Sequence, residues 1–241
     1  MSYALSQIDL QHFGIVTAKA FVSNSLAWRD VHARARRDGV KLLMLRIPAE
    51  HLELAREVQH ENAELMDVLC YFEHGLTESS DFITDCPLGG LLIRRAKEQD
   101  VMPAREVVRS IFFEYPNHYR NDPRLDRHDV DEVYPSWAET IIKSAEACVL
   151  LAENEGKPVG ISAVVPVDTG GFDVALFGIH PDLAGQGLGD VLLRRSMQWT
   201  WTHGGTRLTY STQLSNLPAR RMLTRHGFLP THDVLTFHLW L

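Results

Sequence analysis

The alternation of apolar runs with polar, glycine-containing stretches predicts regular secondary structure along most of the chain. In the first third, apolar runs of strand length are separated by stretches whose apolar residues have helical spacing. We expect the first helix to be capped by Ser25 and to end at Asp38-Gly39, where glycine can adopt the left-handed conformation. The predicted elements are strands 13–22, 42–47 and 66–72 and helices 25–38 and 50–59.

The remainder of the chain predicts an antiparallel meander followed by further helices and strands. Glu155-Gly156 and 169–171 have the composition of hairpin turns, so the strands around them are expected to pair. Residues 114–136 contain Pro116, Pro123 and Pro135 and predict a long irregular loop, a kind of segment that often carries function. The predicted strands are 91–94, 148–152, 158–167, 172–179, 207–213 and 232–241, and the predicted helices are 103–113, 137–146, 190–201 and 218–226.

Residues 73–90 are poor in apolar side chains and rich in turn formers, which indicates a linker. We therefore predict a smaller N-terminal α/β domain at residues 1–88 and a larger domain at residues 89–241. The second domain is expected to contain a meander followed by a strand–helix–strand unit, so both parts of the chain combine helices and strands in an α/β arrangement.

Composition and charge narrow the function classes. The chain has 241 residues, 45% apolar and 23% charged, which is ordinary for a globular protein. Its formal charge of −7 argues against a dedicated nucleic-acid binder. The 3 cysteines and 12 histidines have no metal-ligand or disulfide-framework spacing, so we expect no metal. Because no basic, apolar leader and no membrane-length apolar run is found, we expect a cytoplasmic protein without membrane contact.

Three alternate glycines, Gly185, Gly187 and Gly189, lie between a predicted strand and a predicted helix. Consecutive backbone N–H groups at a helix N-terminus can bind a phosphate or pyrophosphate, although a tight turn without a ligand has the same spacing. The loop does not match a P-loop, since Asp190-Val191 follows the last glycine. It does not match a dinucleotide fingerprint either, because it follows a meander.

The sequence resembles the GNAT superfamily of acyl-CoA-dependent N-acetyltransferases over about residues 91–241. The resemblance rests on Phe177-Gly-Ile179-His-Pro181, the glycine loop, and Asn216 followed by Gly227-Phe228. It implies an α/β (α+β) fold with a mixed sheet, behind a smaller α/β N-terminal domain, and acetyl-CoA as donor. It also implies a strand at 177–179 that splays from strand 207–213, and loop amides that hold the CoA pyrophosphate. It also implies that Asn216 binds the pantetheine arm, although a helix N-cap is the alternative for that residue. The cofactor-binding residues it implies are Phe177, Gly178, Ile179, Gly185, Gln186, Gly187, Leu188, Gly189, Asp190 and Asn216.

Two positions depart from the family pattern. Ala184 stands where the loop usually opens with Arg or Gln, and Leu223 stands where a Tyr often protonates the leaving thiolate. Candidate replacements for that acid are His226 and Tyr210, whose alternative roles are a helix-end cation and a packed aromatic. Candidates to accept the amine proton are Glu114, His118 and Asp173, and the sequence does not rank them.

A narrower resemblance concerns the acceptor. His12-Phe13-Gly14, residues 112–137 and Ser211–Asn216 are similar to the group of TDP-fucosamine acetyltransferase and related nucleotide amino-sugar acyltransferases, which have a reduced N-terminal domain. This implies direct attack of a nucleotide-linked amino sugar on the thioester. The expected substrate-binding residues are His118, Tyr119, Arg120 and Gln213, with Arg120, Arg124 and Arg127 as diphosphate partners.

The sequence is also compatible with other functions. The same fold can acetylate a peptide, an antibiotic or a polyamine. The two off-pattern positions, Ala184 and Leu223, are also compatible with a degenerate acyl-CoA-binding regulatory module. Whether the protein forms a homodimer is open.

Overall fold

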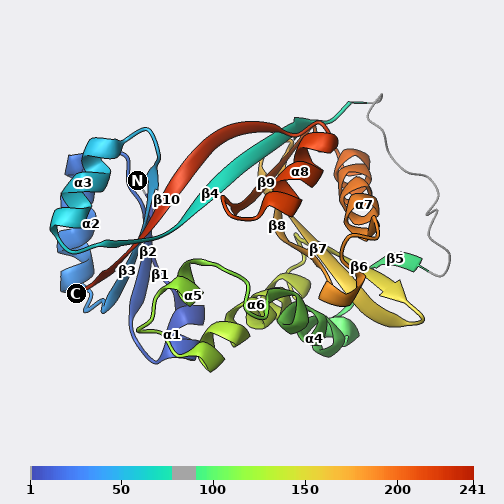
Figure 1. Cartoon of the computed structure of the whole chain (residues 1–241), viewed down its shortest axis with the longest axis horizontal. Coiled ribbons are helices and arrows are strands. Elements are labelled where there is room, and N and C mark those ends of the chain that lie inside the picture. The colour runs from blue at the N-terminus through green and yellow to red at the C-terminus, as the bar shows by residue number, and fades with distance from the viewer. Residues whose placement is uncertain (1, 78–90) are drawn as a thin grey trace.

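The computed structural model describes residues 2–77 and 91–241, and the strands in those residues form one sheet (Figure 1). The sheet order is β1-β2-β3-β10-β4-β9-β8-β7-β6-β5. Only the pairs β2–β3 and β8–β9 are parallel. The strands are β1 (Ser2–Leu5), β2 (Thr17–Phe21), β3 (Leu42–Pro48), β4 (Glu64–Gly75), β5 (Leu91–Arg95), β6 (Cys148–Asn154), β7 (Lys157–Asp168), β8 (Gly171–Ile179), β9 (Arg207–Gln213) and β10 (Leu229–Trp240).

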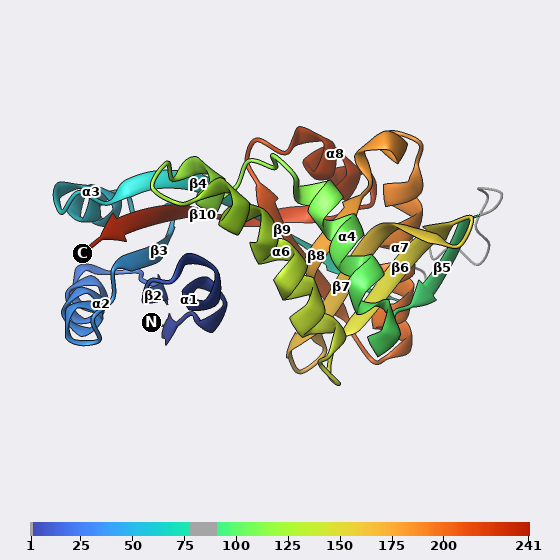
Figure 2. The same cartoon turned by 90° about the horizontal axis from the view of Figure 1, so that it is seen from below.

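Helices cover both faces of this sheet, which confirms the predicted mixed α/β class. Figure 1 shows α1, α4, α5 and α6 along one side, and Figure 2 shows the same layer from below. The other side carries α2 and α3 at one end and α7 and α8 at the other. The helices are α1 (Gln7–Phe13), α2 (Ser25–Arg37), α3 (Leu52–His60), α4 (Val101–Phe112), α5 (His118–Asn121), α6 (Arg127–Ile142), α7 (Leu188–Thr202) and α8 (Leu217–Arg225), with short 3₁₀ turns at Glu98–Asp100 and Pro181–Leu183.

The two faces of β3 show how the sequence pattern creates these layers. Successive strand side chains point to opposite faces. Leu43, Leu45 and Ile47 pack in the cluster with α2 and α3. Leu42 and Met44 pack instead against α5 and α6. An almost unbroken apolar run therefore buries both faces, as expected for a strand inside a sheet covered on both sides.

Strand β10 lies between β3 and β4 and is antiparallel to both. Val234–Trp240 pairs with residues 42–48, so a strand from the predicted second domain completes the sheet of the first. The predicted boundary between residues 88 and 89 lies outside the described residues. The division into domains 1–88 and 89–241 stays a proposal, and the shared sheet joins the two parts.

The start of the chain differs from the prediction. Ser6 caps α1 by accepting from the backbone N–H of Asp9, so Phe13 ends a helix and the expected strand 13–22 begins only at Thr17. Asn24, not Ser25, caps α2 through its side chain. The hairpin turn at Glu155-Gly156 is confirmed, since both residues have positive φ, as a type I′ turn requires.

The expected irregular loop at 114–136 is largely helical, so that prediction was wrong. Asn117 caps the short α5, and Asp126 caps α6, which starts ten residues earlier than the predicted helix at 137. Pro135 lies inside α6, where it removes one backbone donor. The proline signal favoured a loop, whereas packing of Val130 and Val133 against the sheet favours the helix.

Candidate active site

Strands β8 and β9 pair for only part of their length. Gly171–Val174 pairs with Arg207–Tyr210, and no pair follows between them. At the same point a register shift in the β7–β8 pairing places a bulge at Ala175, and β8 continues with β7 alone. The two strands therefore part, and we call the point after Val174 and Tyr210 the vertex. The predicted splay between these strands is present.

A cavity of about 1530 Å³ includes this opening. Near the vertex its walls are the diverging ends of β8 and β9, the glycine loop and the start of α8. It continues over the sheet face below α4, α5 and α6 as far as β2 and β3. The cavity thus joins the predicted cofactor region to the N-terminal part of the sheet.

The glycine loop has the backbone geometry of an anion site. Gly185 and Gly187 have φ of 78° and 82°, which L side chains rarely adopt. Gly187 precedes α7 without any side-chain cap, so the first N–H groups of the helix are available to a ligand. Gly189 has a different role, because an added Cβ would lie 3.3 Å from Sδ of Met222 on α8.

Replacing Gly187 by Val is expected to weaken CoA binding about 10- to 100-fold, because strain of about 1–3 kcal/mol per residue would move the loop. Isothermal titration with CoA measures the effect. The control is Ala184→Arg, which leaves every loop glycine in place and is expected to bind as tightly or more tightly. Unchanged affinity in Gly187→Val would contradict the assignment of the loop to the donor.

The other predicted cofactor residues are placed as follows. Phe177, Gly178, Ile179 and Asp190 line the cavity, whereas Gln186 and Leu188 do not. Gln186 donates to the backbone oxygen of Asp182 at 3.4 Å. Burial alone would raise the pKa of Asp190, but the hydrogen bonds from Arg225 and His226 lower it overall. That carboxylate is therefore held between helices rather than aimed at a ligand.

Asn216 lies at the cavity and also caps α8. Its Oδ1 accepts from the N–H of Ala219 at 3.2 Å, so the N-cap reading is confirmed. Its Nδ2 donates to Oγ1 of Thr212 at 3.0 Å and to the hydroxyl of Tyr115 at 3.1 Å. The same hydroxyl donates to Oε1 of Gln213, a predicted substrate residue. These contacts fix one wall of the cavity beside the vertex.

Two of the predicted catalytic residues lie outside the cavity. His226 Nε2 is 2.7 Å from Oδ1 of Asp190, and its Nδ1 accepts from Arg194 at 3.4 Å. Glu114 is exposed, with a left-handed φ of 56°. Neither side chain lines the cavity.

The vertex itself carries one acidic and one phenolic side chain. Tyr210 is the register partner of Val174, is buried, and packs edge-on to Phe177 with ring centroids 5.6 Å apart. Burial raises the pKa of Tyr210, so its hydroxyl stays protonated. Asp173 is one residue earlier and therefore on the opposite face, where it accepts from Oγ1 of Thr209 at 2.7 Å. Burial also raises the pKa of Asp173.

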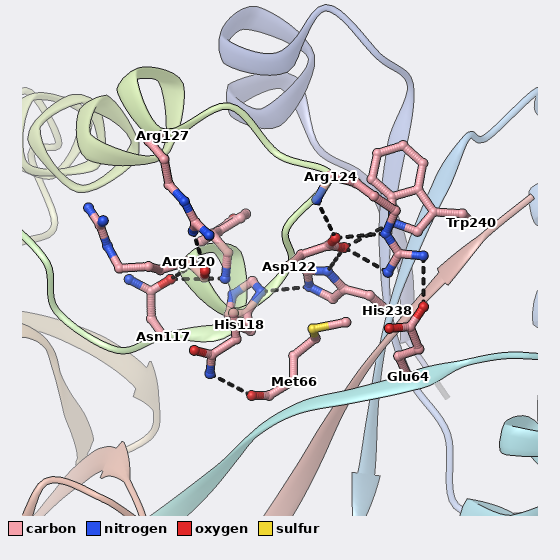
Figure 3. A network of polar contacts seen from close by, with 12 residues as sticks. Glu64, Met66, Asn117, His118, Arg120, Asp122, Arg124, Arg127, His238 and Trp240 are labelled. Atoms are coloured by element: carbon pink, nitrogen blue, oxygen red, sulfur yellow. Dashed lines mark hydrogen bonds and ion pairs between the residues drawn. The ribbon is translucent and has the colours of Figure 1, made fainter.

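A hydrogen-bonded chain leads from the end of β10 to His118 in the cavity (Figure 3). Asp122 is buried and accepts from Nε1 of Trp240 at 2.9 Å and from Arg124 Nε at 2.7 Å. Its Oδ2 lies 2.8 Å from Nδ1 of His238, and Nε2 of His238 lies 2.9 Å from Nδ1 of His118. Burial alone would raise the pKa of Asp122, but these hydrogen bonds lower it.

When His238 is neutral, this chain sets the tautomers of both imidazoles. An ionised carboxylate only accepts, so His238 donates through Nδ1 and accepts through Nε2. His118 must then donate through Nδ1, and its Nε2 presents a lone pair. Burial is the main cause that lowers the pKa of His118, which keeps the ring neutral.

Among the other predicted substrate residues, Tyr119 lines the cavity but Arg120 does not. The Tyr119 hydroxyl donates to Asp9 Oδ1 at 2.8 Å and accepts from Lys19 at 2.7 Å. The three arginines expected to bind a diphosphate have partners in the protein and lie outside the cavity: Arg120 with Asp131, Arg124 with Asp122 and Glu64, and Arg127 with the backbone oxygen of Arg120.

Sequence reasoning missed Arg46, which lines the cavity from β3. A signal was present, since Arg46 is the single charge in the strand sequence Leu-Leu-Met-Leu-Arg-Ile-Pro. A charged side chain in a strand buried on both faces is rare unless it has a partner or a function. Asp122 and His238 were also missed, and only their spatial meeting shows their connection.

Comparison with known proteins identifies the family of this chain. The model of the acetyltransferase (GNAT) family matches residues 106–228. The chain belongs to this family of N-acetyltransferases, whose donor is acetyl-CoA. Among the described residues, none of the helices is long and apolar enough to cross a membrane.

Individual relatives are distant. The spore coat polysaccharide biosynthesis protein SpsD of Bacillus subtilis (strain 168) is 22% identical over 206 residues, which are 84% of this chain and 68% of SpsD. A GCN5-related N-acetyltransferase from Sphaerobacter thermophilus superposes with a TM-score of 0.68 at 15% identity, over 99% of this chain and 76% of that one. A tandem GNAT protein from the clavulanic acid biosynthesis pathway gives 0.63 at 13% identity, over 89% and 69%. The solved structures share the fold.

Proposed function

We propose that this N-acetyltransferase acetylates the amine of a nucleotide-linked amino sugar. The observation that carries the proposal is the length of the cavity, which runs from the vertex to β3 and has room for far more than a small amine. Tyr71, Tyr134 and Trp137 line it and offer aromatic faces to a base or a sugar. Similarity to SpsD, named for polysaccharide biosynthesis, supports a sugar acceptor.

The two faces of the vertex suit direct acyl transfer. Asp173 would take the proton of the ammonium group, and the neutral amine would attack the thioester carbonyl carbon. The carbon–nitrogen bond forms and the carbon–sulfur bond breaks, and Tyr210 would donate its proton to the departing sulfur. The nitrogen loses its second proton as the amide forms, this proton replaces the one that Tyr210 gave, and Asp173 releases the first proton to solvent. The raised pKa of Asp173 makes it a better base than an ordinary carboxylate, and a protonated Tyr210 can act as the acid. Asp173 thereby replaces Glu114 as our candidate base.

We expect no acyl-enzyme. Cys70 and Cys148 are buried, and burial raises the pKa of each thiol to about 11. Neither lines the cavity, and a thiol rather than a thiolate is a poor nucleophile. Replacing all three cysteines by Ser (Cys86 lies outside the described residues) should leave kcat within about a factor of three, given intact folding. An acetylated cysteine found by mass spectrometry during turnover would refute direct attack.

The acceptor is tested by following free CoA thiol with acetyl-CoA and four classes of amine. We expect kcat/KM for a nucleotide-linked amino sugar to exceed that for the free amino sugar, because binding of the remote group orients the amine. A peptide amine and a polyamine serve as comparisons. Equal or better turnover of either comparison would overturn the sugar acceptor and leave the acetyltransferase in place.

A further inference from the structure

Arg46 projects from the middle of the sheet into the cavity. Strand alternation places it on the same face as Leu42 and Met44, toward α5 and α6. Within the described residues, it makes no hydrogen bond or ion pair. Lys19, which also lines the cavity, differs because it is 3.0 Å from the Asp9 carboxylate.

Arg46 lines the same cavity as Asp173, His118, Tyr119 and Tyr134. After burial, which has the largest effect, the positive charge of Arg46 contributes to the pKa of four cavity groups, lowering each: Asp173, His118, Tyr119 and Tyr134. These groups belong to β8, α5 and α6. Arg46 is exposed, and it lines the cavity between these elements.

Thr236 provides a second and independent observation. It is the register partner of Arg46 on β10, lines the cavity, and is only 1% exposed. Its Oγ1 has no hydrogen-bond partner within the described residues. Buried hydroxyls almost always have a partner, so this hydroxyl is left to bond a group that enters the cavity. On the neighbouring strand β4, the register partner of Thr236 is Asp67. Asp67 does not line the cavity and accepts from Gln213 at 3.4 Å.

His118 completes the same region. Its hydrogen-bond partner His238 is two residues beyond Thr236 on β10 and therefore on the same face. Figure 3 shows the hydrogen-bonded chain from Asp122 through His238 to His118, and a neutral His238 in this chain leaves His118 Nε2 as an acceptor. A ligand hydroxyl or N–H beside the group that Arg46 binds would match this lone pair.

We propose that Arg46, Thr236 and His118 form a distal subsite for a phosphate ester of the acceptor and an adjacent hydroxyl. Guanidinium and hydroxyl donate to the phosphate, and His118 accepts from the hydroxyl. The role of this subsite in binding the acceptor rests on the proposed acetyl transfer. Three strand spacings, from β3 through β10 and β4 to β9, separate its backbone from the vertex, about 14 Å. The acceptor is therefore elongated, with its amine and its phosphate well apart.

Binding of inorganic pyrophosphate tests the anion site directly. The protein is first saturated with CoA, so that the glycine loop is filled, and pyrophosphate is then titrated by calorimetry. We expect wild type to bind pyrophosphate and Arg46→Gln to bind it at least about 10-fold more weakly, because the variant loses one charge-assisted contact. Arg29→Gln is the matched control, because Arg29 is exposed on α2 and pairs only weakly with Glu57 at 3.6 Å.

Thr236→Val separates a ligand role from a structural role. The isosteric methyl removes an unpaired hydroxyl, so the melting temperature should stay equal or rise, while pyrophosphate affinity falls several-fold. A variant that is both stable and weakly binding cannot be explained by damage to the fold. His118→Phe should raise KM for a nucleotide amino sugar more than it weakens pyrophosphate binding, since pyrophosphate has no sugar hydroxyl.

Kinetics separate this inference from the proposed function. With Arg46→Gln, kcat/KM should fall about 10- to 100-fold for a nucleotide amino sugar and stay constant for the free amino sugar. If wild type does not acetylate the nucleotide sugar but pyrophosphate binding still depends on Arg46, the proposed acceptor fails and the subsite stands. If wild type saturated with CoA does not bind pyrophosphate, or Arg46→Gln binds it equally, the subsite is refuted.

Discussion

Replacing Asp173 by Asn should lower kcat about 10²- to 10⁴-fold with little change in KM for acetyl-CoA, the loss of one general base. The amide has the same shape and can keep the contact with Oγ1 of Thr209, but it cannot take a proton. The variant should recover as pH rises, because more of the amine is then already neutral. Pre-steady-state and steady-state rates between pH 6 and pH 10 provide the measurement.

The same substitution should stabilise the protein at neutral pH. Burial raises the pKa of Asp173 in the folded state, so folding binds protons at this site and the charged form is unfavourable. The advantage of Asn is full above the folded pKa and disappears as pH falls toward the ordinary aspartate value of about 3.9. Asp168→Asn, at an exposed side chain that pairs with Arg207, is the control. A less stable Asp173→Asn would show that the carboxylate is structural.

Asp122→Ala should destabilise the fold by about 3–5 kcal/mol, because it leaves buried donors without their charged partner. Asp122 joins the segment between α5 and α6 to β10 through His238 and Trp240, all at or near the sheet (Figure 3). Urea unfolding measures the loss. Asp126→Ala, in the same segment, is the matched control and should cost about 1 kcal/mol for an exposed helix cap.

Asp122→Ala and Asp173→Asn should change stability in opposite directions at neutral pH, and both changes should decrease in acid. Hydrogen bonds lower the pKa of Asp122 in the folded state against the opposing effect of burial. Its contribution to stability is therefore complete above the unfolded value of about 3.9 and is lost as pH falls toward the folded value. The difference between wild type and variant should shrink in acid. A constant difference would mean that packing, not charge, carries the effect.

Local patterns predicted the elements of the candidate donor site. The glycine spacing at 185–189, the alternation in β9 and the cap at Asn216 are all properties of a few neighbouring residues. The structure has each of them where the sequence predicts it. The splay between β8 and β9 followed from the family resemblance, and the bulge at Ala175 is its physical cause.

What the sequence did not predict depends on distant pairing. The insertion of β10 between β3 and β4 is a choice among sheet orders that hydrophobic alternation cannot make. The meeting of Asp122, His238 and His118 follows only from that order. Pro123 and Pro135 led to the prediction of a loop where α6 lies. Prolines favour loops locally, whereas burial of one helix face favours the helix overall.

The central position of β10 also has a consequence for folding kinetics. β3 and β4 have no direct pairing and acquire their common neighbour only from residues far later in the chain. Contacts of such long sequence separation form slowly and leave apolar strand edges uncovered in the interval. Refolding should therefore show a late phase in which β10 enters the sheet. Since Thr236 and His238 lie on that strand, acceptor binding should be the last property of the native protein to appear.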